Sequence, residues 1–341
     1  MKRCLTLAKL GLGKTTPNPM VGAVVVCDDK IIGEGFHERS GGNHAEVEAI
    51  NDVKNKTLLK KSSLYINLEP CNHYGKTPPC TDFIIKKKIP KVIVGSMDPN
   101  PKVYGSGIQK LKDNNINVKS GVLKDECDIL NKRFFCYYNN NRPYIILKWA
   151  ESEDGFISPI NQKEGEIFWI TTYESRQISH KWRSEEDSIV VGINTIQKDN
   201  PKLTSRYWNG KSPIPVIIDP RNRININSKI FKNNSKLIHF IDNKTKIINK
   251  NSMQIDFNTS LNEILKTLHK SKINSILVEG GKKTIQKFID NNLWDEARYF
   301  VGNKKIYKGI LAPVIKNRNW TKKTISQDIL YTSINHSAKR L

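Results

Sequence analysis

Apolar residues recur along the chain with two different spacings, and together these predict alternating strands and helices. In the first 120 residues, β-branched runs predict strands over residues 21–35 (with a turn at 28–30), 64–68 and 91–95. Amphipathic spacing predicts helices over residues 3–11, 44–53, 81–88 and 106–114. Strands that alternate with helices predict an α/β domain, in which helices cover a parallel or mixed sheet.

The alternation continues after a polar run, Asn-Asn-Asn-Arg-Pro, at residues 139–143. Strands are predicted over residues 144–149, 188–192, 214–219, 237–241, 275–279 and 297–301. Helices are predicted over residues 173–183, 260–271 and 284–292, and the Asn- and Lys-rich region 222–259 gives the least clear pattern. Because a polar run that ends in Pro is typical of a loop, we expect two α/β domains, residues 1–141 and 142–341.

Charge changes this picture less than its size suggests. The net charge is +23, but Arg supplies only 12 of the 56 cations, and the chain also contains 35 Asn. Arg is the cation best suited to bidentate phosphate binding, and aromatic residues do not alternate with Arg as they do in nucleic-acid-binding surfaces. We therefore interpret the charge as a solvated Lys-rich surface and expect no nucleic-acid partner. A basic RNA-binding platform remains the non-enzymatic alternative.

The location of the protein follows from what the sequence lacks. There is no apolar run of about 18 residues, so no membrane span is expected. The first residues show no signal-peptide pattern, and six scattered Cys do not form a disulfide framework. We expect a cytoplasmic protein, in which paired Cys more often bind metal or act in catalysis.

One His and two Cys in the first half suggest a zinc site. His44-Ala45-Glu46 is followed by Pro70-Cys71 and then by Pro79-Cys80, and both ligand clusters precede predicted helices. Zinc takes imidazole and thiolate ligands, and three protein ligands leave a position for water. Glu46 stands two residues after His44, where it can carry a proton from that water to a leaving amine.

The spacing of the two Cys separates this site from the nucleic-acid deaminases. Zinc deaminases of nucleobases carry H-x-E followed by P-C-x-x-C. Here eight residues, 72–79, lie between Cys71 and Cys80, and they include Lys76. A cation beside the metal suits an anionic small molecule. A nucleic-acid deaminase, which the net charge favours, is the alternative.

Several segments resemble the bifunctional deaminase/reductase family of riboflavin biosynthesis, RibD/RibG, over nearly the whole chain. The segments are Thr16-Pro17-Asn18-Pro19-Met20-Val21-Gly22-Ala23, Gly33-Glu34-Gly35-Phe36-His37, His44-Ala45-Glu46-Val47, residues 68–80 with Gly75-Lys76-Thr77-Pro78-Pro79-Cys80, and Asp98-Pro99-Asn100-Pro101. The resemblance implies a cytidine-deaminase-like zinc domain with one zinc ion on His44, Cys71 and Cys80 and with Glu46 as proton shuttle. It also implies substrate contacts at Asn18, His37, Lys76 and Asn100.

In the second half, a predicted strand ends at Glu279-Gly280-Gly281 and a helix follows. Glycines let a backbone approach a ligand, and a helix N-terminus offers N–H groups to a phosphate. The G-x-G-x-x-G fingerprint is absent, so this feature alone is weak. Two of the few Arg, Arg183 and Arg206, suit phosphate capture.

The same resemblance implies a dihydrofolate-reductase-like second domain that uses NADPH. It places Lys148 and Asp199 at the chemistry. It assigns NADPH contacts to Ala150, Trp169, Thr195, Asp199, Gly281, Lys282, Lys283, Thr284, Ile285 and Gln286, and substrate contacts to Arg183, Leu203, Arg206 and Glu279. The expected reactions are hydrolytic deamination of a phosphoribosylamino-pyrimidinone and reduction of its ribosyl chain, by a homo-oligomer (a dimer or tetramer) whose partners are small phosphorylated pyrimidines.

Two departures from the family pattern affect the second domain. Ile167 stands where a small polar residue is common, and Pro220 stands where Ser or Thr is usual near the cofactor. A deaminase with a degenerate reductase half is therefore a further alternative.

Overall fold

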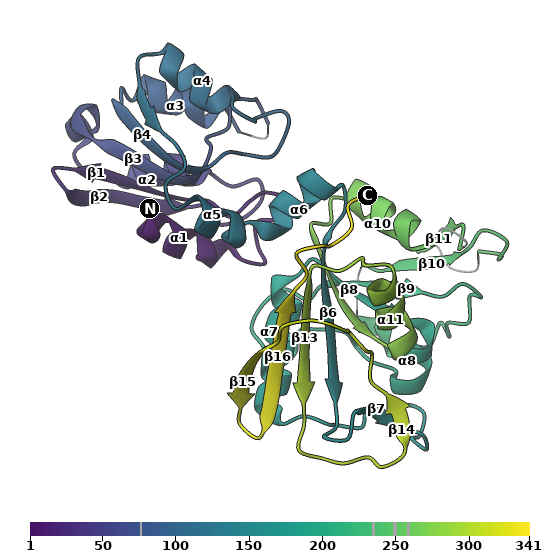
Figure 1. Ribbon diagram of the computed structural model, residues 1–341. Coiled ribbons are helices and arrows are strands. Elements are labelled where there is room, and N and C mark those ends of the chain that lie inside the picture. Colours follow the sequence, from purple (N-terminus) through teal and green to yellow (C-terminus); the bar gives the residue numbers. More distant parts are fainter. Residues whose placement is uncertain (76, 234–235, 248–250, 258–259) are drawn as a thin grey trace. The chain divides into compact units, whose positions relative to one another are not determined.

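The computed structural model describes residues 1–75, 77–233, 236–247, 251–257 and 260–341 (Figure 1). The chain forms two compact units, Met1–Asn139 and Asn140–Leu341, and each is described by itself. The boundary between them lies two residues before the expected one.

The N-terminal unit is built on a five-stranded mixed sheet in the order β2-β1-β3-β4-β5. Its strands are β1 (Gly22–Cys27), β2 (Lys30–Phe36), β3 (Ser63–Leu68), β4 (Lys91–Ser96) and β5 (Asn117–Lys119). Its helices are α1 (Lys2–Ala8), η1 (Lys9–Gly11), α2 (Ala45–Asp52), η2 (Lys56–Lys61), α3 (Cys80–Lys86), α4 (Ser106–Asp113), α5 (Lys124–Leu130) and α6 (Lys132–Asn140). β3 and β4 are parallel, so their carboxyl ends lie at one edge of the sheet.

Helices cover both faces of this sheet (Figure 1). Successive strand residues point to opposite faces, so Val25 of β1 packs with Ala49 of α2 and Ile84 of α3 in the main core. On the other face, Val24 packs with Leu7 of α1. The main core lies beneath α2 and α3, and two of the three predicted metal ligands lie at the N-terminal ends of these helices.

The C-terminal unit is built on a nine-stranded sheet in the order β11-β10-β9-β8-β12-β6-β13-β16-β15. Its strands are β6 (Tyr144–Glu151), β8 (Ser188–Gly192), β9 (Ile214–Ile218), β10 (Ile238–Asp242), β11 (Ser252–Ile255), β12 (Ser275–Gly280), β13 (Glu296–Val301), β15 (Thr321–Ile325) and β16 (Asp328–Ile334). A small second sheet pairs β7 (Phe156–Pro159) with β14 (Gly309–Leu311). Seven neighbouring strands, from β11 to β13, are parallel.

Helices also cover both faces of the larger sheet. They are α7 (Tyr173–Glu185), α8 (Ile193–Asp199), α9 (Lys229–Asn233), α10 (Ser260–Lys270) and α11 (Lys282–Asp290). On one face Val278 of β12 packs against Leu265 of α10 and Phe288 of α11. On the other face Val191 of β8 packs against Ile196 of α8. The hydrophobic residues of the parallel strands are thus buried on both sides, as their continuous apolar runs predicted.

The predicted strands and helices are present with ends that differ by a few residues, but the polar run at 139–143 is not a free linker. Helix α6 continues through Asn140, and its Phe134 and Tyr138 rings are 4.9 Å apart. Aromatic packing on this helix thus extends regular structure into the asparagine run. No helix of the described residues is long and apolar enough to cross a membrane.

Candidate active sites

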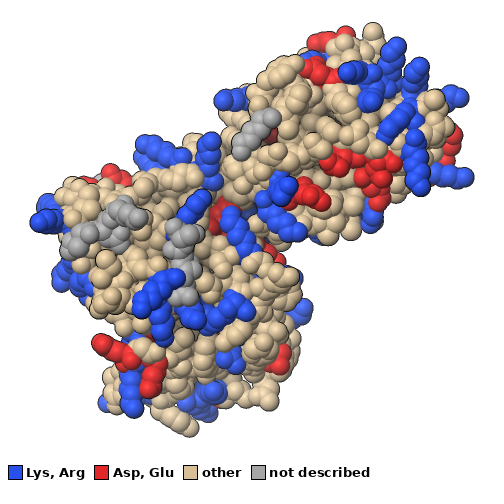
Figure 2. All heavy atoms as spheres, turned by 180° about the vertical axis from the view of Figure 1, so that it is seen from behind, with Lys and Arg blue, Asp and Glu red and all other residues tan. Residues whose placement is uncertain are grey.

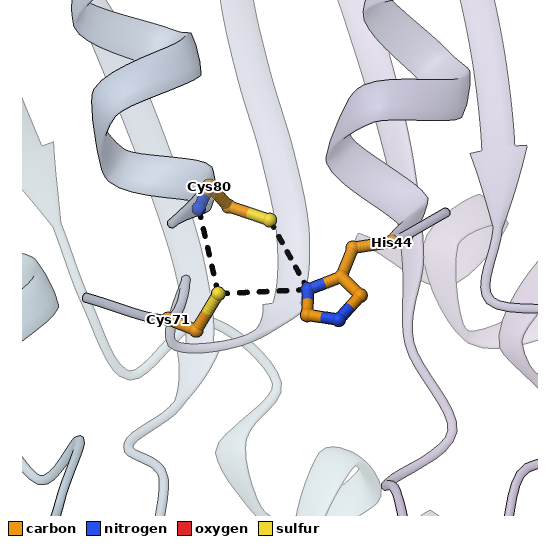
Figure 3. A group of neighbouring side chains, drawn as sticks. All are labelled: His44, Cys71 and Cys80. Carbon is orange, nitrogen blue, oxygen red and sulfur yellow. Dashed lines mark hydrogen bonds between the residues drawn. The ribbon is translucent and has the colours of Figure 1, made fainter. Parts of the chain in front are cut away.

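One nitrogen and two sulfur donors converge at the carboxyl end of β3 (Figure 3). His44 is the N-cap of α2 and Cys80 is the first residue of α3, whereas Cys71 lies in the loop after β3. The Nδ1 atom of His44 lies 3.3 Å from the Sγ of Cys80 and 3.5 Å from the Sγ of Cys71. The structure brings together the three residues that the sequence pattern singled out, with their donor atoms within 4.8 Å of one another.

This donor set fits a zinc ion in both chemistry and spacing. A tetrahedral zinc ion with bonds of about 2.0–2.3 Å holds its ligand atoms about 3.5 Å apart. His44 keeps this separation from both thiols. An imidazole and two thiolates suit zinc, and three protein ligands leave a fourth position for water. The arrangement therefore has the form of a catalytic rather than a structural site.

The two thiols change each other's pKa. A hydrogen bond from the Cys80 thiol lowers the pKa of Cys71 to about 4. The same contact, together with burial, raises the pKa of Cys80 well above its usual value. The backbone N–H of Cys80, at the start of α3, also donates to the Sγ of Cys71 over 3.4 Å. One thiolate is thus stabilised by the fold itself.

Glu46 lies in the first turn of α2, two residues after His44, the metal ligand that caps the helix. Glu46 is buried, with an exposed fraction of 3%. Burial raises the pKa of its carboxyl group, and the nearby imidazole of His44 opposes this effect. A buried carboxyl group with a raised pKa can both take up and release a proton during a reaction.

Two predicted substrate contacts, Asn18 and His37, lie beside the metal ligands. The Nδ2 atom of Asn18 is 3.0 Å from Nε2 of His37, and Nδ1 of His37 is 2.9 Å from the carbonyl oxygen of Asn43. Burial lowers the pKa of His37, so its neutral ring donates from Nδ1 and accepts from Asn18 at Nε2. The ring meets that of His44 edge-on, with centroids 5.3 Å apart.

Two asparagines that the sequence analysis did not identify hold the turn that carries Asn18. Asn131 accepts from the N–H of Met20 over 2.8 Å and donates to its carbonyl oxygen over 2.9 Å. Asn67 donates to the same carbonyl over 3.1 Å and accepts from Gly22 over 2.7 Å. Asparagine is common at helix ends, and an asparagine in a strand does not indicate which backbone groups it binds, so a single sequence gives no signal for this role.

Glu69 fixes the loop that carries Asn100. Its carboxylate accepts hydrogen bonds from the backbone N–H groups of Asp98, Gly105, Gly107 and Ile108. The Oδ1 atom of Asn100 accepts from the N–H of Lys102 over 3.1 Å. Because Cys71 follows two residues after Glu69, these bonds tie the loop to a metal ligand. Lys76, the other predicted substrate contact, lies outside the described residues.

In the C-terminal unit, a cavity of about 780 Å³ opens at the carboxyl ends of β6, β8, β9 and β12. Ligands bind at this edge of open α/β sheets. Its walls include Lys148, Ala150, Trp169, Arg183, Thr195, Asp199, Leu203, Arg206, Glu279, Gly281, Lys282, Lys283, Thr284 and Ile285. Gln286 does not line the cavity, because its side chain accepts from the N–H of Val314 over 3.0 Å on the outer side of α11.

Glycines bring the backbone close to two threonines in this cavity. A Cβ atom on Gly192 would lie 2.5 Å from Oγ1 of Thr284, and one on Gly281 would lie 3.2 Å from Oγ1 of Thr195. Gly280 has a φ of +127°, which favours glycine. Helix α11 begins directly afterwards without a side-chain cap. The N–H groups at the start of this helix, next to Gly280 and Gly281, fit the phosphates of a dinucleotide cofactor.

Glu279 holds two cations at the end of β12. Its carboxylate accepts two hydrogen bonds of 2.7 Å from Arg183, and Lys148 lies 3.7 Å from one of its oxygens. Burial favours the neutral acid, but Arg183 and Lys148 outweigh it and hold the pKa of Glu279 at about 2. Burial lowers the pKa of Lys148 despite this contact. The lysine is therefore a better proton donor than an exposed one.

Comparison with known proteins identifies the family. Residues 143–306 match the family model described as the RibD C-terminal domain. Residues 1–96 match the cytidine and deoxycytidylate deaminase zinc-binding region. A riboflavin biosynthesis protein RibD from Aquifex aeolicus is 39% identical over 319 residues, which cover 91% of this chain and 88% of the relative. The chain belongs to the RibD family.

Other RibD proteins extend the match. The RibD protein of Escherichia coli is 32% identical over 89% of this chain and 87% of its own length. A solved deaminase/reductase structure from Thermotoga maritima is 35% identical, with a TM-score of 0.86 and coverage of 98% of this chain and 97% of that one. These matches confirm the expected family and the order of its two domains, a zinc-binding deaminase region followed by the RibD C-terminal domain.

Within this RibD chain, the remaining predicted residues take specific places. Arg183 is committed to Glu279 and also donates to the carbonyl oxygen of Thr204 over 3.1 Å, so it is less free for phosphate than expected. Asp199 accepts from Gln162 over 2.9 Å. Burial raises the pKa of Asp199. Ile167 and Pro220, the two residues that differ from the family pattern, both line the cavity. There they offer apolar contact instead of hydrogen bonds.

Proposed function

We propose that this chain catalyses two successive steps of riboflavin biosynthesis, one in each unit. The first is hydrolytic deamination of 2,5-diamino-6-(5-phosphoribosylamino)pyrimidin-4(3H)-one. The second is NADPH-dependent reduction of the ribosyl chain of the product, 5-amino-6-(5-phosphoribosylamino)uracil, to ribityl. The observation that carries the proposal is the buried Glu46 beside a zinc-competent triad in a chain that also has the reductase cavity.

In the first step, His44, Cys71 and Cys80 would hold zinc, whose Lewis acidity makes water nucleophilic near neutral pH. Glu46 accepts a proton from the attacking water and delivers it to the departing amino group. Water thus supplies the new carbonyl oxygen, and the amino group leaves as ammonia. Asn18 and His37 orient the pyrimidine ring, since their amide and imidazole groups lie next to His44.

In the second step, NADPH would supply a hydride to C1′ of the ribosyl group. Gly281 and the start of α11 would hold its phosphates. As the bond from C1′ to the ring oxygen breaks, that oxygen needs a proton. Lys148 donates it, because burial lowers the pKa of its ammonium group and Glu279 holds it in place. The product is the open ribityl chain.

The test supplies the purified, zinc-loaded protein with the diamino substrate, with and without NADPH. We expect ammonia release without NADPH, and NADPH oxidation only once the deaminated product has formed. Glu46→Gln should lower ammonia release by about 10²–10⁴-fold and leave zinc content unchanged. Glu48→Gln, in the same first turn of α2, is the matched control and should act like the unmodified protein.

Three outcomes would contradict this proposal. Ammonia release without any NADPH oxidation would favour a degenerate reductase half, to which Ile167 and Pro220 point. Release of ammonia from RNA but not from the small molecule would favour a nucleic-acid deaminase. Full activity of Glu46→Gln would show that Glu46 is not the proton carrier.

A cytoplasmic location and a homo-oligomer are further parts of the proposal. The location is in keeping with six free thiols, and light scattering tests the oligomeric state.

A further inference from the structure

A buried histidine that the reactions above do not use lies in the wall of the reductase cavity. His180 is on α7, one turn before Arg183, and it is 3% exposed. Its Nδ1 atom is fully buried without a partner, and neither ring nitrogen forms a hydrogen bond with any residue that the structure describes. A buried imidazole without partners is costly. Because Nδ1 is sealed, Nε2 is the ring nitrogen that a ligand in the cavity can contact.

Arg206 lies beside this histidine across a shared tyrosine. The ring of Tyr207 meets the ring of His180 edge-on, with centroids 4.7 Å apart. The guanidinium of Arg206 lies over the same tyrosine, 4.8 Å from its centroid. No carboxylate in the described parts of the chain forms a salt bridge with Arg206. One wall of the cavity thus presents a cation without a counterion and an imidazole without a hydrogen bond.

The groups around His180 have a net positive charge that a dianion would balance. It faces Arg183 on its own helix, Arg206 in the loop after α8, Lys148 on β6 and Glu279 on β12. One carboxylate thus stands against three cations. A phosphate monoester carries up to two negative charges at neutral pH, which would balance the remaining positive charge without any proton on His180.

We propose that His180 binds the 5-phosphate of the pentose substrate as a neutral hydrogen-bond donor, beside Arg206. The inference deepens the proposed reductase function and takes the identity of its ligand from it. Burial, followed by the charges of Arg183 and Arg206, lowers the pKa of His180 to about 3, which supports the neutral form. Because buried N–H groups are rarely left unpaired, the proton belongs on Nε2 and the lone pair on the sealed Nδ1.

The first experiment compares NADPH oxidation with the phosphorylated substrate and with its dephosphorylated form. His180→Leu should lower kcat/KM about tenfold for the phosphorylated substrate, as the loss of a hydrogen bond to a charged group predicts, and leave the dephosphorylated substrate unaffected. His180→Gln retains an N–H donor and should recover most of the loss. Lys181→Gln, an exposed neighbour outside the cavity, controls for the loss of helix-surface charge.

The second experiment needs no turnover. Calorimetry should show that ribose 5-phosphate binds more tightly than ribose, that His180→Leu removes this difference, and that binding of NADPH is unchanged. Titrations in buffers of different ionisation enthalpy should show no proton uptake by the protein. Equal losses for both substrates, an unchanged affinity of His180→Leu for ribose 5-phosphate, a changed affinity for NADPH, or uptake of one proton would each overturn the proposal.

The two experiments also separate this inference from the proposed function. If the unmodified protein binds ribose 5-phosphate through His180 but oxidises no NADPH, the reductase function fails and the phosphate subsite stands. If NADPH is oxidised but the phosphate has no effect on binding or turnover, the function stands and the subsite fails.

Discussion

The carboxylate of Glu279 balances the cations of the reductase cavity. The effect of pH on its contribution to stability can be predicted. Its folded pKa of about 2 lies below the ordinary glutamate value of 4.5. Its contribution to stability is therefore complete above pH 4.5 and is lost as the pH falls towards 2. A separation of one pH unit corresponds to about 1.4 kcal/mol. Acid should thus weaken the C-terminal unit through this residue.

The test compares denaturant unfolding of the unmodified protein and Glu279→Gln at about pH 5 and about pH 3.5, where the difference between them should shrink by about 1 kcal/mol. At pH 5 the variant should be less stable by about 3–5 kcal/mol, because Arg183 and Lys148 lose their counterion. All six Trp lie beyond residue 140, so tryptophan fluorescence follows this unit alone.

The control for this prediction is an exposed ion pair in the same unit. Glu153 lies 3.9 Å from Lys305, and both side chains are at least half exposed. Glu153→Gln should change stability by less than about 1 kcal/mol at either pH. A difference for Glu279→Gln that does not vary with pH would contradict the assigned charge state of Glu279.

For single residues, the sequence predicted the identity of the important side chains more accurately than the contacts that they make. His44, Cys71 and Cys80 could be found because metal ligands combine rare residue types at restricted spacings. The contact between Arg183 and Glu279 joins positions 96 residues apart and depends on how α7 packs against β12. His180 has no such signature, since a lone histidine on a helix is usually a structural residue.

Among the elements, the end of α5 has a specific task that mutation can reveal. Asn131 follows this helix and holds the backbone of Met20 at both its N–H and its carbonyl group. Asn131→Ala leaves a buried N–H unpaired, which costs about 1–3 kcal/mol. Because the turn that carries Asn18 is then less fixed, KM of the deaminase step should rise more than kcat falls.

The kinetics of ammonia release and the rate of zinc release measure this effect in the N-terminal unit, while tryptophan fluorescence of the other unit should stay unchanged. Asn114→Ala provides the control, since this residue also follows a helix, α4, but is exposed. An equal effect of both substitutions would mean that Asn131 acts only as an ordinary helix cap.

The buried parallel strands were predictable because they are continuous runs of β-branched residues. Short elements at sheet edges were not. β14 has only three residues, which are exposed or half-buried, so no alternation marks it. Helix α6 was not predicted, and its last residues are asparagines, which weakly favour loops. Its aromatic contacts outweigh that preference.

For the whole molecule, the distribution of charge matters more than its total. On the face shown in Figure 2, Lys and Arg lie scattered over both units, with Asp and Glu between them. On this face (Figure 2) the cations are spread among acidic residues instead of forming one continuous basic track. The sequence could give the net charge of +23, but only the fold shows which cations, such as Lys148 and Arg183, face a cavity.

The division of the chain into two units leads to a prediction about the chain as a whole. Each has its own hydrophobic core and its own site, so each step needs residues of one unit only. A mixture of Glu46→Gln and Lys148→Met should therefore oxidise NADPH when given the diamino substrate, although neither variant does so alone. A lag should precede oxidation, since the deaminated intermediate must leave one chain and enter another.

The lag makes this prediction quantitative. It should shorten in proportion to the concentration of Lys148→Met, the variant that supplies the intermediate, and should vanish when the deaminated intermediate is added directly. The double variant Glu46→Gln/Lys148→Met is the matched control and should stay inactive with the diamino substrate. If the mixture stays as inactive as the double variant while each single variant retains its own half-reaction, the intermediate passes between sites without release. The two steps would then depend on the arrangement of the units within one assembly.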